Sequence, residues 1–90
     1  MSNSENFTLA TQVVMKLSQT PSNQEKLVLY KFFKQATVGD VNTSRPGMLD
    51  FAGKAKWDAW ESVKGTTKVD AETKYIILVN ELIKNYGLNQ

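Results

Sequence analysis

Apolar and basic residues recur at helical spacing in one short segment of this sequence. Leu27, Tyr30 and Lys34 are separated by three and four residues, so they share one face if the segment is helical. Lys31 and Val38 flank that face. Lysine ammonium groups bind phosphates, and tyrosine offers both an apolar ring and a hydroxyl. This surface therefore suits a ligand with an anionic head and an apolar tail.

The same segment also has a purely structural interpretation. Its other face carries enough apolar residues to pack a helical bundle, namely Val28, Leu29, Phe32, Phe33 and Ala36. Lys31 and Lys34 are then solvated helix residues, and Tyr30 lies at the rim of the core. From this segment alone, the structural interpretation is favoured.

Aromatic and basic residues also alternate between positions 54 and 60. Trp57 and Trp60 with Lys54 and Lys56 are a combination that can bind nucleotides or single-stranded nucleic acid by stacking and phosphate contacts. The tryptophans lie among small residues, which is typical of core packing, so we expect both in the core. Lys56 is expected to join a cationic cluster near them. Eleven basic against nine acidic residues give a net charge of only +2, which argues against nucleic acid as the partner.

The composition removes most catalytic chemistry. The chain has no histidine and no cysteine, which excludes histidine-based catalytic triads, Cys–His pairs and the usual zinc sites. Lysine or carboxylate catalysis stays formally open. However, the aspartates show no metal-ligand spacing and the glycines form no phosphate-binding loop. We expect no enzyme, no metal site and no cofactor.

Four helices are predicted to position these side chains, with no convincing strand. The first covers residues 5–17, with Phe7, Ala10, Val14 and Leu17 at helical spacing. The second opens with a capping box and extends to about residue 37, and a third covers residues 51–63. The fourth begins after Thr67, whose hydroxyl is expected to cap it, and runs to Tyr86 with Gly87 as its C-terminal cap. The fold class is all-α: one four-helix bundle, residues 1–90, with a long loop between helices 2 and 3.

The chain also predicts an intracellular location. The N-terminus has no signal-peptide pattern, and no apolar run approaches the roughly 20 residues that span a bilayer. Ser2 stands where myristoylation requires glycine. We expect a cytoplasmic monomer that makes at most transient contact with membranes.

Three stretches of the sequence resemble a known family. They are KQATVGD at 34–40, RPGMLDF at 45–51 and GKAKWDAW at 53–60. Together they are similar to the acyl-CoA-binding protein family, and the similarity extends from Phe7 to Tyr86 and Gly87. It implies a four-helix bundle that binds medium- to long-chain acyl-CoA esters, carries them and has no catalytic activity.

The resemblance also implies a set of ligand-binding residues. Tyr30 matches the family's ligand-contacting aromatic, and Phe33 matches a tyrosine whose ring lies against adenine. Lys34 and Lys56 match the lysines that bind the nucleotide phosphates. Tyr75 matches a tyrosine that lines the head-group site.

Two positions depart from the family pattern. Phe33 keeps an aromatic ring but lacks the hydroxyl, and Met15 stands where the family commonly has a lysine. Lys16 is adjacent but points about 100° away on a helix. We expect the acyl tail to lie in a groove that includes Leu27 and Met15. The alternative function is a helical protein-interaction module whose ligand binding is lost or altered.

Overall fold

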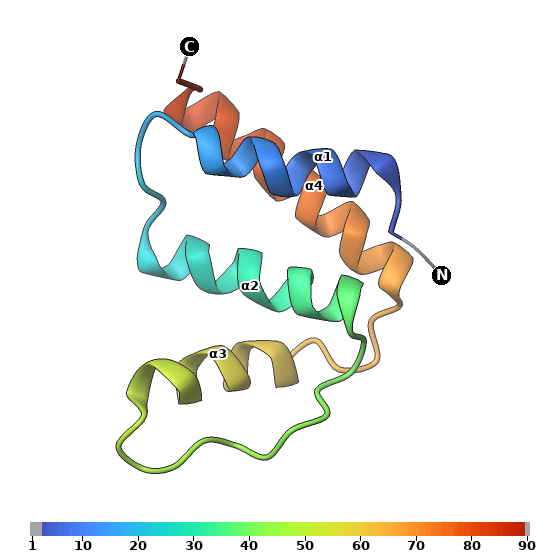
Figure 1. The fold of residues 1–90 in the computed structure, drawn as a ribbon, viewed down its shortest axis with the longest axis vertical. Coiled ribbons are helices and arrows are strands. Elements are labelled where there is room, and N and C mark those ends of the chain that lie inside the picture. The colour runs from blue at the N-terminus through green and yellow to red at the C-terminus, as the bar shows by residue number, and fades with distance from the viewer. Residues whose placement is uncertain (1–2, 90) are drawn as a thin grey trace.

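The computed structural model describes residues 3–89, which form four α-helices and one 3-10 turn (Figure 1). The elements are α1 (Glu5–Val13), η1 (Val14–Lys16), α2 (Asn23–Thr37), α3 (Phe51–Glu61) and α4 (Lys68–Tyr86). Helix α2 is central: α4 packs against one side of it and α3 against the other, while α1 packs on α4. The prediction of an all-α fold with a long loop between α2 and α3 is confirmed.

Local capping explains the helix starts. The Ser22 hydroxyl accepts from the Glu25 N–H and the Glu25 carboxylate accepts from the Ser22 N–H, which completes the predicted capping box. Thr67 caps α4 in the predicted way. Helix α4 ends at Gly87, whose φ of +76° is a conformation that glycine adopts without strain. Helices α2 and α4 therefore have the limits that the sequence predicted.

The predicted end of the first helix was wrong. Helix α1 stops at Val13 and the chain tightens into η1 instead of continuing to Leu17. Leu17 forms an isolated antiparallel bridge with Leu88, and the Ser18 N–H donates to the Gly87 carbonyl at 2.9 Å. Backbone groups that would have extended the helix are thus paired with the C-terminal segment, far away in sequence.

The predicted end of the third helix was also too late. After Glu61, the N–H groups of Val63 and Lys64 donate to carbonyls three residues earlier. This is turn geometry rather than α-helix. The chain then passes through Gly65 at a φ of +92°, which reverses its direction toward α4.

The core lies where α1, α2 and α4 meet. It consists of Phe7, Ala10, Ala36, Ala71, Tyr75 and Val79, with Leu29 and Phe32 of α2 packed against it. Alanine at the helix contacts allows close approach, and the aromatic rings fill the space that remains. Helix α3 contributes none of these six residues and packs separately on α2.

The long loop after α2 is fastened to α3 by side chains. Arg45 forms a bidentate ion pair with Asp58, at 2.9 Å for both contacts. The indole of Trp57 donates to the Thr43 carbonyl, and that of Trp60 to the Gly39 carbonyl. Trp60 is 4% exposed, as predicted for a core residue.

The expectation that Trp57 is a core residue was wrong. It is only partly buried and lies against the loop. Helical spacing cannot distinguish a residue covered by a loop from one covered by another helix.

None of the helices within residues 3–89 is long and apolar enough to cross a membrane.

Candidate functional site

A cleft lies between α2 and α3, on the side of α2 that faces away from the core. Its volume is about 370 Å³. Helix α2 lines it with Asn23, Lys26, Leu27 and Tyr30, and α3 lines it with Ala52, Ala55 and Lys56. The lining is mostly apolar, and it also includes two lysines and a tyrosine.

Helical periodicity explains how these side chains meet. On α2, Lys26 and Leu27 precede Tyr30 by four and three residues. On α3, Ala52 lies three and four residues before Ala55 and Lys56. The alanine side chains are small, so two packed helices leave room for a ligand between them.

Two lysines lie over aromatic rings beside the cleft. The Lys56 ammonium is 5.7 Å from the centroid of Tyr30, and the Lys34 ammonium is 4.8 Å from that of Trp60. Lys34 is one turn beyond Tyr30 on α2. Among residues 3–89 the one ion pair joins Arg45 to Asp58, so both ammonium charges are free for an external anion.

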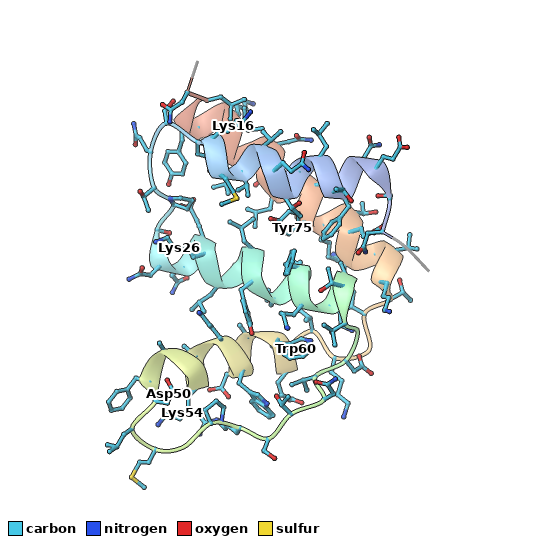
Figure 2. All side chains as sticks on the ribbon, viewed as in Figure 1. Lys16, Lys26, Asp50, Lys54, Trp60 and Tyr75 are labelled. Atoms are coloured by element: carbon cyan, nitrogen blue, oxygen red, sulfur yellow. The ribbon has the colours of Figure 1, made fainter. Side chains whose placement is uncertain are left out.

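A second aromatic group lies on the core side of α2. The ring of Phe33 is near-parallel to that of Phe7, with 6.1 Å between centroids, and is 6.2 Å from Tyr75. Figure 2 shows Tyr75 between α4 and α2. Tyr75 is 4% exposed, and burial raises the pKa of its phenol. Phe33 is 38% exposed and offers solvent an aromatic surface supported from beneath.

The residues predicted for ligand binding thus fall into separate groups. Leu27, Tyr30 and Lys56 line the cleft, and Lys34 is adjacent. Phe33 and Tyr75 belong to the aromatic group just described.

Two other predicted residues lie away from the cleft walls. The Lys31 ammonium is 5.3 Å from the ring of its neighbour Phe32 and does not line the cleft. Met15 lies in η1, is 84% exposed and is not part of the cleft lining either.

Four cleft residues were not predicted as ligand contacts: Asn23, Lys26, Ala52 and Ala55. A signal existed for Lys26, which lies one turn before Tyr30 on the stripe already identified. Ala52 and Ala55 give no such signal, because small residues beside tryptophans are typical of core packing and the sequence does not show that α3 turns them toward α2.

A second hollow lies between α1 and α4 and has a volume of about 330 Å³. Its walls are Asn6, Leu9, Ala10, Val13, Ile76, Val79, Asn80 and Ile83, none of which is charged. It therefore offers no counter-charge to an anionic head group. Within residues 3–89, no cluster of three or more acidic side chains is placed to hold a metal ion.

The sequence profile of the acyl-CoA-binding protein family matches residues 4–79. The chain belongs to this family. It is 53% identical over 81 residues to acyl-CoA-binding protein homolog 1 of Caenorhabditis elegans, covering 90% of this chain and 94% of that protein.

Solved structures of the family share the fold. Acyl-CoA-binding protein 2 of Oryza sativa superposes with a TM-score of 0.86 at 42% identity, covering 90% of each chain. The protein from Moniliophthora perniciosa superposes with a TM-score of 0.84 at 48% identity, covering 93% of this chain and 85% of that one. The predicted family and fold are confirmed.

Proposed function

We propose that this protein binds medium- to long-chain fatty acyl-CoA esters and carries them without chemical change. The observation that supports this most strongly is the cleft between α2 and α3. Its walls combine Leu27, Ala52 and Ala55 with the ammonium of Lys56 and the hydroxyl of Tyr30. An acyl-CoA molecule has the matching composition, because a polyanionic nucleotide is joined to a hydrocarbon chain.

The lysines are assigned to the head group. Lys34 and Lys56 bind the phosphate of the 3′-phosphorylated ribose and the neighbouring phosphates, and Tyr30 adds a hydrogen bond. Each charge-assisted contact contributes roughly 1.5–3 kcal/mol. Both ammonium groups already lie over aromatic rings, so their positions are partly fixed before a ligand arrives.

Phe33 is assigned to the adenine. Its ring is 38% exposed and is supported by Phe7 and Tyr75, which leaves a flat apolar surface for stacking. Tyr75 is 4% exposed and acts chiefly by holding Phe33, with its hydroxyl as the one polar group it can offer to the head group.

The acyl tail is assigned to the apolar part of the cleft. Each buried methylene contributes roughly 0.8 kcal/mol, so a long chain contributes on the order of 10 kcal/mol before association costs. Leu27 contacts the tail within the cleft. The head group then fixes orientation, and the tail sets the preferred chain length.

This proposal describes a non-enzymatic, monomeric carrier of the cytoplasm, with no metal or cofactor and with acyl-CoA as its ligand. The mainly apolar, cation-lined cleft suits binding, and no side chain is assigned a role in bond cleavage.

Native mass spectrometry tests the proposal. Mixing the protein with palmitoyl-CoA should give a one-to-one complex, and an equal concentration of palmitate should give none. If no complex with palmitoyl-CoA forms, while titration shows only unsaturable association, the chain is a protein-interaction module and the proposal fails.

A further inference from the structure

Three large apolar side chains project into solvent at the end of the long loop. Met48 is 82% exposed, Leu49 is 86% exposed and Phe51, the first residue of α3, is 72% exposed. We call these three residues the apolar tip. None of them belongs to the hydrophobic core. Large apolar side chains that are exposed together commonly mark a surface that binds a partner.

The loop holds the apolar tip outward in a defined conformation. The Asp50 N–H donates to the Gly47 carbonyl, and the Asp50 carboxylate caps α3 by accepting from the Gly53 N–H. The Lys54 ammonium donates to the Met48 carbonyl at 2.9 Å and lies 4.9 Å from the centroid of Phe51. Because the backbone is already ordered, docking of the tip requires little further loss of conformational entropy.

The apolar tip adjoins the cleft between α2 and α3. Phe51 is followed on α3 by Ala52, Ala55 and Lys56, which line the cleft. Figure 2 shows Asp50 and Lys54 at this end of α3, on the same side of the molecule as Lys26 of α2. A surface that covers the tip therefore also meets the entrance of the cleft.

The charges around the tip are mostly positive. Lys54 lies over Phe51, and Lys26 and Lys56 line the adjoining cleft. The nearby Asp50 carboxylate is engaged as a helix cap. Apolar side chains that project beyond ammonium groups match the headgroup boundary of an anionic bilayer, where lysines meet phosphates and rings enter the acyl region.

We propose that the apolar tip docks on anionic lipid bilayers and brings the entrance of the cleft between α2 and α3 to the membrane surface. Acyl-CoA esters are amphiphiles that partition into bilayers, so docking shortens the path of the tail between membrane and cleft. The role of docking in transfer of acyl-CoA rests on the proposed function. Binding of the apolar tip to a bilayer does not rest on it.

The first experiment uses the absence of cysteine in the chain to place one fluorophore. Leu49→Cys is labelled with an environment-sensitive dye, and Ile77→Cys, at a 53% exposed position of α4, is the control. Ligand-free protein is mixed with ligand-free vesicles containing roughly one-third phosphatidylserine. The dye at position 49 should shift to the blue and brighten, whereas the dye at 77 should not. No response at 49, or equal responses at both positions, overturns the proposal.

The second experiment measures sedimentation with the same vesicles. A variant carrying Met48→Ser, Leu49→Ser and Phe51→Ser should bind at least about tenfold more weakly than the Val69→Ser, Ile77→Ser control, which removes two other exposed apolar side chains. The exposure of all five positions allows both variants to fold, which circular dichroism verifies. Equal vesicle binding by the two variants contradicts the proposal.

Solution binding of octanoyl-CoA, measured without vesicles, separates docking from ligand contact. The triple variant should keep the affinity of the control. If it loses that affinity and keeps vesicle binding, the tip contacts the ligand and the docking proposal is wrong. Vesicle binding by a protein that binds no acyl-CoA would refute only the proposed function.

Discussion

Lys34 and Lys56 come from different helices but occupy equivalent surroundings. Each ammonium lies over an aromatic ring, at 4.8 Å from Trp60 and 5.7 Å from Tyr30. An aromatic face attracts a cation without neutralising it, unlike a carboxylate. The two charges are therefore held in place and stay available for phosphate groups.

Replacing either lysine by alanine should weaken binding of palmitoyl-CoA and of free CoA by a similar factor, roughly ten- to a hundredfold, because each loses a charge-assisted contact to the head. Titration calorimetry measures both affinities. Lys74→Ala, an exposed lysine on α4 outside the cleft, is the matched control and should change neither. Unchanged affinity for free CoA in the Lys34 and Lys56 variants would show that these residues do not bind the head.

A substitution at Met15 tests whether the CoA head group lies near η1. The side chain is 84% exposed, so a lysine fits there without disturbing packing. Met15→Lys should tighten binding of free CoA, by up to about tenfold, because a new ammonium approaches the phosphates. Met48→Lys is the control, with the same change at an 82% exposed position. Equal effects of the two substitutions would mean that only overall charge matters and that no phosphate lies near position 15.

Helix α2 uses two of its faces for two purposes. Ala36, Leu29 and Phe32 pack toward the core, while Leu27 and Tyr30 face α3 across the cleft. Local signals were sufficient to predict this helix, because its capping box marks the start and turn-forming residues mark the end. The partner of its second face was not predictable, since nothing in the sequence orients α3.

The end of α1 and the position of Trp57 could not be predicted from the sequence for the same reason. Helix α1 ends early because residues 17–18 pair with residues 87–88, and Trp57 lies beneath the loop because its indole bonds to Thr43. Both features depend on contacts between distant parts of the chain. Of the residues predicted for ligand binding, Leu27, Tyr30 and Lys56 line the cleft. Lys26 and the alanines were not predicted, because they line a common cleft only when α3 packs on α2.

Gln35 connects the end of α2 with the turn before α4. It is 1% exposed, and its amide nitrogen donates to Asp40 and to the Thr66 carbonyl at 2.8 and 2.7 Å. Its side-chain oxygen is buried without a partner among residues 3–89. Asp40 also accepts from the Gly65 N–H, so one carboxylate joins three segments.

Gln35→Ala should lower the free energy of unfolding by about 1–3 kcal/mol, because Asp40 and the partly buried Thr66 carbonyl lose the donor that joins them to α2. Gln35→Glu should be more damaging at pH 7, since a second carboxylate then faces Asp40. Its deficit should shrink as pH falls and one carboxyl of the pair becomes protonated. Urea unfolding followed by circular dichroism measures both effects, with the exposed Gln12→Ala as a neutral control. A Gln35→Glu variant as stable as the wild type at pH 7 would contradict this role.

Three carboxylates join segments that are distant in sequence. The Tyr86 hydroxyl holds the pKa of Glu25 below its usual value, the Gly65 N–H does so for Asp40, and the Arg45 guanidinium does so for Asp58. These contacts connect α2 to the end of α4, the start of the long loop to the turn before α4, and a later part of that loop to α3.

Stability should therefore fall at acid pH. A carboxyl group whose pKa is lower in the folded state stabilises the fold above its unfolded pKa of about 4, and the contribution is lost as pH decreases through the lower folded value. The chain has no histidine, so the melting temperature should be nearly constant between about pH 6 and 8 and decrease below about pH 4. Thermal unfolding followed by circular dichroism tests this, and Glu25→Gln should show a smaller decrease. A melting temperature that rises between pH 5 and 3 would show that these carboxylate contacts do not stabilise the fold.

We propose that one site, formed by the cleft between α2 and α3 and the adjoining Lys34 and Phe33, recognises both parts of an acyl-CoA molecule. Titration calorimetry with palmitoyl-CoA, palmitate and free CoA tests it most directly, because the two smaller ligands each supply only one part. Palmitoyl-CoA should bind much more tightly than either, with a stoichiometry of one. Equal affinity for palmitate and palmitoyl-CoA would show that the lysines of α2 and α3 do not recognise a head group.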